Sequence, residues 1–196
     1  MVRTESVVGF FDRLASGWDA DTVRSEDVIR TILDNAGVTA GKTVLDVACG
    51  TGVLIPDYLK RGAASVTAID ISPNMAAIAR EKFRGKPVQV LCGDAAETVF
   101  DRMFDCIVVY NALPHFADPE RLIERLAAAL SPGGSLTIAH GMSRERIDAH
   151  HGSVPEDVSD RLMPVEALAA VLKRYLRVTV QISDDRMYQA VAVRDA

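Results

Sequence analysis

The sequence predicts an α/β fold in which a mostly parallel, doubly wound sheet lies between two layers of helices and ends in a C-terminal antiparallel hairpin. Short, nearly continuous apolar runs alternate with longer amphipathic stretches along the 196 residues, which is typical of strands covered on both faces. Two more apolar runs lie close together near the C-terminal end, separated by a short polar segment. We therefore expect a three-layer sheet with one antiparallel edge.

Seven apolar runs are the expected strands. The five parallel strands are expected at residues 43–47, 65–69, 88–91, 104–110 and 135–139, and the hairpin strands at 177–182 and 187–193. The polar residues 183–186 form the hairpin turn, and a helix over 163–175 precedes it.

Helix starts are marked twice by an N-cap residue followed by proline. Ser72 precedes Pro73, and Asp118 precedes Pro119, so a helix is expected to begin at each proline. The second helix carries leucines every four residues, and the glycine pair at 133–134 is expected to end it.

Composition and charge exclude several classes of protein. The net charge is −5 and no Lys/Arg run is present, which argues against a nucleic-acid partner. The uncharged stretches are too short to span a bilayer, and the first residues lack the apolar core of a signal peptide. The three cysteines, Cys49, Cys92 and Cys106, form no CxxC pair and suit reduced thiols. We expect a cytoplasmic protein with no membrane partner.

A glycine-rich loop follows the first expected strand, in residues 44–52 (VLDVACGTG). Gly50 and Gly52 let the backbone turn tightly and approach a ligand, although an ordinary strand-to-helix turn would use the same residues. The acidic Asp46 would repel the pyrophosphate of a dinucleotide, and Ile55 stands where the dinucleotide pattern has its third glycine. The loop therefore favours a ligand with positive charge and no phosphate.

Two more acids follow the next strands. Asp70 ends the second strand, twenty residues after Gly50, a spacing that suits hydrogen bonds from both ribose hydroxyls. Asp94 follows the third strand and can accept an adenine amino group. Each acid alone could be a cap or a turn residue, although Ser72 is better placed to cap the helix. Three acids at the ends of three successive strands indicate a nucleoside site.

The motif series over roughly residues 43–140 resembles that of the class I, seven-stranded, Rossmann-like S-adenosylmethionine-dependent methyltransferases. The motifs in order are VLDVACGTG, AIDISPNM, CGDAAE, FDCIVVYNALPHF and LSPGGSLTIAH. The resemblance implies S-adenosyl-L-methionine as cofactor and S-adenosyl-L-homocysteine as product. The cofactor-binding residues that it implies are Asp46, Ala48, Cys49, Gly50, Gly52, Asp70, Ile71, Met75, Asp94, Ala95 and Asn111.

These residues divide by the part of the cofactor they are expected to meet. Asp46 and the glycine loop would line the methionine part, Asp70 the ribose, and Asp94 the adenine edge. Asn111 would lie near the sulfonium. Ala48 departs from the family pattern, because many members have the first glycine of the loop there, and this puts the local loop geometry in doubt.

The histidines are the candidates for chemistry, because methyl transfer needs a general base only when the nucleophile arrives protonated. All four, His115, His140, His150 and His151, lie beyond the fourth strand. We expect His115, His140 or His151 to act as the base. A metal site built from two or three of these imidazoles and Asp148 is the second possibility, and polar loop residues are the third.

The N-terminal segment FFDRLASGWDAD, at residues 10–21, resembles the lid helix of many family members. Phe10, Phe11 and Trp18 could close over a ligand, although packing onto the sheet is their commoner role. We expect one methyltransferase domain over 1–196. Lid or cap helices would occupy residues 1–40, the cofactor-binding core 41–140, and the substrate-side loop, helix and hairpin 141–196.

The expected function is methyl transfer to a small-molecule acceptor whose accepting atom (O, N, S or C) is open. The alternative is a non-catalytic S-adenosylmethionine-binding regulator or partner subunit on the same fold. An NAD-dependent oxidoreductase is disfavoured by Asp46 and Ile55. Both a monomer and a homodimer are compatible with the sequence.

Overall fold

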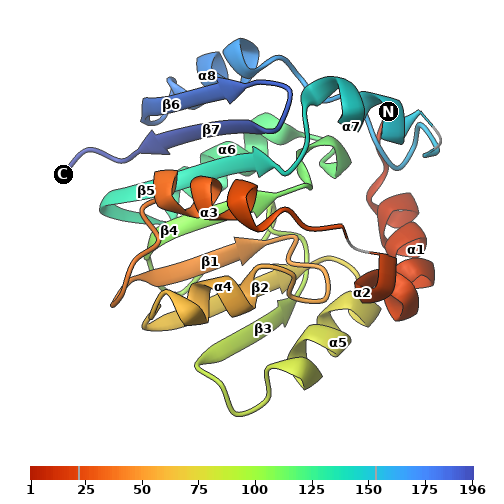
Figure 1. The fold of residues 1–196 in the computed structure, drawn as a ribbon, viewed down its shortest axis with the longest axis horizontal. Coiled ribbons are helices and arrows are strands. Elements are labelled where there is room, and N and C mark those ends of the chain that lie inside the picture. The colour runs from red at the N-terminus through yellow and green to blue at the C-terminus, as the bar shows by residue number, and fades with distance from the viewer. Residues whose placement is uncertain (22, 153) are drawn as a thin grey trace.

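A seven-stranded sheet forms the centre of the computed structural model, which describes residues 1–21, 23–152 and 154–196 (Figure 1). The strands are β1 (Thr43–Val47), β2 (Ser65–Asp70), β3 (Val88–Cys92), β4 (Phe104–Tyr110), β5 (Leu130–His140), β6 (Arg177–Ser183) and β7 (Tyr188–Val193). Their spatial order is β3-β2-β1-β4-β5-β7-β6. The first five strands run parallel, whereas β7 pairs antiparallel with both β5 and β6. The predicted doubly wound sheet with a terminal antiparallel hairpin is confirmed.

The helices connect these strands and cover the sheet. The α-helices are α1 (Thr4–Leu14), α2 (Trp18–Asp21), α3 (Glu26–Asn35), α4 (Ile55–Lys60), α5 (Pro73–Lys82), α6 (Pro119–Ala128), α7 (Arg144–His151) and α8 (Val165–Leu172). Two short 3-10 turns, η1 (Ala15–Gly17) and η2 (Leu113–His115), complete the elements. Ser72 and Asp118 cap α5 and α6 as predicted, because each side chain accepts a hydrogen bond from the backbone N–H three residues on.

Two apolar clusters, one on each face of the sheet, hold the three layers together. One cluster packs the inner faces of α3 and α4 against residues such as Val44, Val66 and Val108. The other packs α6, α7 and α8 against the opposite face, through residues such as Leu45 and Ile107. Since neighbouring strand residues point to opposite faces, the continuous apolar runs of β1 and β4 supply both clusters at once.

Several predicted boundaries were wrong: four strands, β2, β3, β6 and β7, are off by one residue at one end, and three elements, α6, β5 and α8, differ by more. The helix that begins at Pro119 ends at Ala128, and the glycine pair at 133–134 lies inside β5 rather than after the helix. Leu130 already pairs with Phe104 of β4, and the Gly133 N–H donates to the carbonyl of Arg194, so β5 starts five residues before the predicted 135. The helix predicted over 163–175 is confined to α8, because Pro164 stands at its N-cap.

The carboxyl ends of the parallel strands face the N-terminal segment. Figure 1 shows α1 and α2 beside the tips of the strand arrows, with α7 at the same end of the sheet. This is the end at which open α/β sheets bind ligands. Within the described ranges, no helix combines the length and apolarity that crossing a bilayer requires.

Candidate functional site

A cavity of about 600 Å³ lies between the carboxyl ends of the strands and the N-terminal segment. Its size falls in the range typical of small-molecule sites. The loops after β1 to β5 supply one side of its lining and α1 supplies the other. All predicted cofactor-binding residues line this cavity except Gly52, and so do His115 and His140.

The loop after β1 bends sharply beneath this cavity. Ala48 and Gly50 both adopt left-handed backbone conformations, with φ of 54° and 56°. Left-handed alanine is strained by roughly 1–2 kcal/mol, so Ala48 keeps the conformation that glycine would adopt more easily. Gly52 also has a positive φ, of 87°, and a Cβ there would clash with the Phe83 ring. Gly52 therefore serves the turn and its packing, and it lies behind the pocket lining.

Asp46 is buried at the end of β1, with 2% of its surface exposed. One carboxylate oxygen accepts a hydrogen bond from the Tyr58 hydroxyl at 3.2 Å. The other, Oδ2, has no hydrogen-bond partner within the described part of the chain. Burial raises the pKa of Asp46 to about 7, the Tyr58 hydrogen bond opposes this rise, and the nearby charge of Asp70 adds to it. A buried carboxylate oxygen of this kind favours binding of a ligand that donates a hydrogen bond or carries positive charge.

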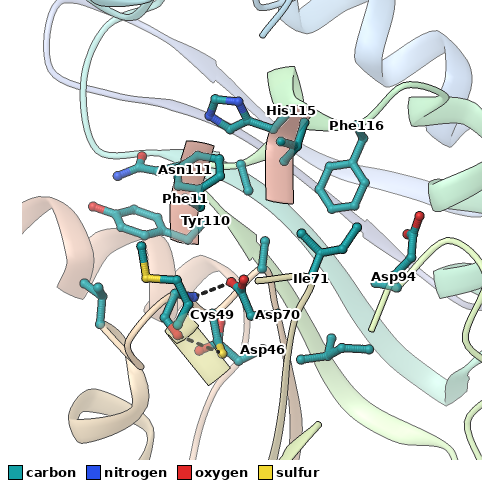
Figure 2. A pocket seen from close by; sticks show the side chains of 18 of the residues that line it. Phe11, Asp46, Cys49, Asp70, Ile71, Asp94, Tyr110, Asn111, His115 and Phe116 are labelled. Atoms are coloured by element: carbon teal, nitrogen blue, oxygen red, sulfur yellow. Dashed lines mark hydrogen bonds between the residues drawn. The ribbon is translucent and has the colours of Figure 1, made fainter. Parts of the chain in front are cut away.

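Asp70 ends β2 and accepts two backbone hydrogen bonds. The Gly50 N–H donates to Oδ2 at 2.7 Å, and the Ser72 N–H donates to Oδ1 at 2.9 Å. Burial raises the pKa of Asp70 although both bonds lower it. Because each carboxylate oxygen can accept a second hydrogen bond, both keep capacity for a pair of ligand hydroxyls. Figure 2 shows Asp46, Cys49 and Asp70 together at the floor of the pocket.

The next two strands contribute Asp94 and Asn111. Asp94 turns the chain after β3 by accepting the Ala96 N–H at 2.8 Å, and its side chain lies at the edge of the pocket (Figure 2). Asn111 follows β4 with a left-handed φ of 55° and accepts the Gly141 N–H through its side-chain oxygen at 2.9 Å. Left-handed non-glycine residues gather at functional sites because the surrounding structure must hold them there. Ala48 and Asn111 both meet this pocket from neighbouring strands.

The face of α1 that meets the pocket is apolar and aromatic. Val7, Phe10, Phe11 and Leu14 line the cavity, and Trp18 follows in α2. The Phe11 ring lies edge-on to Trp18, with centroids 5.6 Å apart, and edge-on to His115 at 4.9 Å. The segment thus forms a roof over the acidic floor.

Polar contacts attach this roof to the sheet side of the pocket. Asp12 accepts hydrogen bonds from the Ser72 hydroxyl and from the Asn74 N–H, the latter at 3.0 Å. Asp19 accepts the Thr51 hydroxyl at 2.5 Å and forms a salt bridge with Lys82 at 2.9 Å. Desolvation raises the pKa of Asp19, but the hydrogen bonds from Thr51 and Lys82 and the charge of Lys82 together outweigh it, so the pKa is lowered.

His115 ends the 3-10 turn η2 and faces the same pocket. Its Nδ1 lies 3.0 Å from the backbone carbonyl of Val158. A carbonyl can only accept, so Nδ1 carries the proton, and in the neutral ring the lone pair is on Nε2. The backbone of a distant loop therefore fixes the tautomer that a general base needs.

The other histidines differ in how they are placed. His140 ends β5, lines the pocket and is buried, with its ring edge-on to Tyr188 at 5.8 Å. His150 and His151 lie at the end of α7, but their side chains fall outside the described residues. Among the side chains that the structure describes, no group of three His, Cys, Asp or Glu could hold a metal ion. The Asp148 carboxylate instead accepts the Leu162 N–H at 2.9 Å.

Sequence patterns missed three contacts of this site. Tyr58 on α4 holds Asp46, Asp12 joins the roof to α5, and the Val158 carbonyl holds His115. Tyr58 looks like a core aromatic in the sequence, and a backbone carbonyl has no sequence signal. Asp12 directly follows Phe10 and Phe11 in α1, which is the one hint the pattern offered.

Known proteins resemble this chain in sequence. A family model described as a methyltransferase domain matches residues 44–134. A demethylmenaquinone methyltransferase from Renibacterium salmoninarum is 29% identical over 147 residues, which cover 70% of this chain and 59% of that protein. A ubiquinone biosynthesis O-methyltransferase from Coxiella burnetii is 34% identical over 105 residues, which cover 49% of this chain and 42% of that protein. The chain spans about half the length of the curated relatives it matches.

Solved structures share the fold. The N-methyltransferase NodS from Bradyrhizobium japonicum WM9, in complex with S-adenosyl-L-homocysteine, superposes with a TM-score of 0.76 at 17% identity. The match covers 97% of this chain and 100% of that one. The seven-stranded topology described above is therefore shared over nearly the whole length.

Proposed function

We propose that the chain is a class I S-adenosylmethionine-dependent methyltransferase, the family that it resembles in sequence and fold, and that it transfers a methyl group from S-adenosylmethionine to a small-molecule acceptor. The observation that carries the proposal is the buried Oδ2 of Asp46, which lines the pocket and has no hydrogen-bond partner within the described residues. A cationic ligand meets that oxygen favourably, whereas a phosphate would be repelled by Asp46 and Asp70 together.

The described residues fit S-adenosylmethionine in the order that the sequence predicts. Asp46 and the loop at Gly50 would hold the amino-acid part, Asp70 would accept the ribose hydroxyls, and Asp94 would meet the adenine edge. When bound, the cofactor supplies a methyl group on a positively charged sulfur. Ile71 and Met75 line the cavity beside Asp70 and offer apolar surface for the adenine ring.

The protein's own contribution is to exclude water, to orient the acceptor and to take a proton. The α1 roof covers one side of the pocket and would shield a bound ligand from water, which strengthens electrostatic interactions there. His115 is proposed as the general base, because its Nδ1 is engaged by the Val158 carbonyl and its other nitrogen can receive a proton. Asn111, held in a left-handed conformation, would orient groups near the transferred methyl.

The names of the relatives support a small acceptor. One is named for demethylmenaquinone and another for ubiquinone biosynthesis. The pocket volume of about 600 Å³ must hold the cofactor and the acceptor together, which also favours a small molecule.

Isothermal titration calorimetry tests the cofactor assignment. We expect S-adenosyl-L-methionine and S-adenosyl-L-homocysteine to bind and NAD to give no heat of binding. Binding of NAD, with no binding of either S-adenosyl compound, would overturn the proposed function. Binding of the S-adenosyl compounds without any methylated product across a broad acceptor panel would show a binding protein instead of an enzyme.

Substitution of His115 tests the proposed base. We expect His115→Gln to lower kcat by roughly 100-fold or more, because general-base catalysis typically contributes 10²–10⁴-fold. Affinity for S-adenosyl-L-homocysteine should change little, since His115 lies on the roof side of the pocket (Figure 2). His140→Gln is the comparison, and unchanged turnover in both variants would end the histidine-base hypothesis.

A further inference from the structure

The pocket has a second side, built from different residues than the acidic floor, and its lining defines the acceptor. Val7, Phe11, Phe116, Met142, Ile147 and Val154 line this part together with His115. We name these residues the acceptor side. None of them lies at the end of β1, β2 or β3, where the cofactor residues are. Figure 2 shows Phe11, His115 and Phe116 gathered opposite Asp46 and Asp70.

We propose that the acceptor is an uncharged aromatic ring bearing a hydroxyl group, which His115 deprotonates as the oxygen is methylated. This inference rests on the methyl transfer proposed above and names its substrate class. The hydroxyl oxygen forms its new bond to the methyl carbon while the carbon–sulfur bond breaks toward sulfur, and the hydroxyl proton passes to Nε2 of His115.

The arginines that line the pocket already form salt bridges, which disfavours an acidic acceptor. Within the described residues, the positively charged side chains that line the pocket are Arg24 and Arg121. Arg24 forms salt bridges with Asp57 at 2.8 Å and with Glu26 at 3.1 Å. Arg121 pairs with Glu97 at 2.6 Å. A carboxylate or phosphate acceptor would compete with Asp57, Glu26 and Glu97 for these guanidinium groups, whose positive charge is already matched.

The positions and existing hydrogen bonds of the acids that line the pocket disfavour a cationic amine acceptor. Asp46, Asp70 and Asp94 lie on the cofactor side of the pocket. Among the described residues, the other lining acids are Glu97, which pairs with the Arg121 guanidinium, and Asp118, which accepts the Arg121 backbone N–H as the N-cap of α6. An ammonium group among the apolar residues of the acceptor side would lose its hydration without a carboxylate to replace it.

An aromatic hydroxyl satisfies both conditions. Its ring can pack against Phe11 and Phe116, and aromatic pairs prefer the edge-on and offset arrangements that Phe11 already makes with His115 and Trp18. Its hydroxyl has a pKa near that of a tyrosine side chain, about 10, so an imidazole can accept its proton during methylation. An aliphatic alcohol gives up its proton far less readily.

A matched panel of acceptors tests the proposal. Catechol, thiophenol, benzylamine, benzoic acid and cyclohexanol would each be incubated with the full chain and S-adenosyl-L-methionine, after calorimetry has established that S-adenosyl-L-homocysteine binds. Release of S-adenosyl-L-homocysteine and formation of the methylated product would be followed by mass spectrometry. We expect catechol to give the highest kcat/KM.

The outcomes separate this inference from the proposed function. A higher kcat/KM for the thiol, the amine, the acid or the aliphatic alcohol would overturn the acceptor class and leave methyl transfer standing. Cofactor binding with turnover of none of the five compounds would also overturn the acceptor class. Failure of S-adenosyl-L-homocysteine to bind would instead overturn the proposed function itself.

A pair of phenylalanine variants tests the acceptor side directly. Phe116→Leu should raise KM for the aromatic acceptor by roughly 3- to 10-fold, the factor that an aromatic pair typically contributes, and leave affinity for S-adenosyl-L-homocysteine within about twofold. Phe100→Leu is the matched control, because Phe100 packs against Phe104 of the core and does not belong to the described pocket lining. Equal KM values for Phe116→Leu and the wild type would contradict the proposed packing.

Discussion

The floor and the roof of the pocket are built in different ways. The floor residues lie at the ends of buried strands, and backbone N–H groups or a buried hydroxyl hold Asp46 and Asp70 in place. The roof is an N-terminal segment attached mainly through side-chain contacts, some of them exposed, such as the salt bridge between Asp19 and Lys82. Exposed ion pairs contribute little to stability, whereas a buried, multiply bonded carboxylate is costly to disturb.

This difference predicts that cofactor binding depends on the floor and acceptor choice on the roof. Side chains on the sheet are fixed before any ligand arrives, so they can hold a cofactor with little loss of entropy. We expect the roof to open and reclose more easily than the floor, because its attachment depends on side-chain contacts rather than on strand pairing. We therefore expect floor variants to change cofactor affinity strongly and roof variants to change turnover modestly.

The largest expected effect comes from Asp70→Asn. The amide nitrogen of asparagine would face the N–H of Gly50 or Ser72, and the ribose would lose a charged acceptor. We expect affinity for S-adenosyl-L-homocysteine to fall by about 100-fold in calorimetry. Asp105→Asn is the control, because Asp105 also accepts a backbone N–H, from Thr43 at 2.8 Å, but does not belong to the described pocket lining. A similar loss of affinity in the control would show a general effect on folding.

Asp46→Asn should have opposite effects on binding and on stability. We expect roughly tenfold weaker binding of S-adenosyl-L-methionine at pH 8, because the ammonium of the ligand loses a carboxylate partner. The ligand-free protein should become more stable at the same pH. The folded pKa of Asp46 is raised to about 7 from an ordinary value of 3.8, so the unfolded chain releases this proton first. Stability therefore falls as pH rises from about 4 to about 7.

Thermal unfolding of the ligand-free variant at pH 5 and pH 8 checks this sign. The gain in Tm of Asp46→Asn over the wild type should be larger at pH 8, where the wild-type carboxylate is charged and buried. An equal change at both pH values would mean that Asp46 does not titrate in this window, and the comparison between floor and roof would lose its electrostatic basis.

The sequence predicted the floor well because parallel strands bring their carboxyl ends to one edge. The bounds of β1 and β4 agree with the predicted 43–47 and 104–110, and Asp46, Asp70 and Asn111 meet there as expected. Local patterns suffice for such positions, since a strand end and its loop are set by neighbouring residues.

The roof contacts could not be predicted in the same way. Asp12 meets Ser72 across 60 residues of sequence, and His115 meets the Val158 carbonyl across 43. Both pairings depend on the paths of the intervening segments, which no local periodicity determines. The sequence predicted β3 as a strand but did not indicate that it lies at the edge of the sheet. Its short apolar run resembles that of a central strand, although β3 is half-exposed and has a neighbouring strand on one side only.

A smaller effect is expected where the roof contacts the loop that holds His115, the proposed general base. The Ser6 hydroxyl donates to Asp157 at 2.6 Å, and the Arg3 N–H donates to the Asp157 carbonyl, next to the Val158 carbonyl that holds His115. Ser6→Ala should lower kcat by roughly threefold, since one hydrogen bond is lost, with cofactor affinity within about twofold. Ser16→Ala, at an exposed serine of η1, is the matched control. Equal kcat values in both variants would show that roof attachment does not position the imidazole.

The smallest effect concerns the backbone of the floor. Ala48→Gly should relieve the left-handed strain at φ 54° and stabilise the protein by about 1 kcal/mol, which raises Tm by roughly 2–4 °C for a chain of this length. Ala64→Gly is the control, because this exposed loop alanine has no positive φ and glycine there should be neutral or destabilising. A lower Tm for Ala48→Gly would mean that the Cβ contributes more through packing than its backbone strain costs.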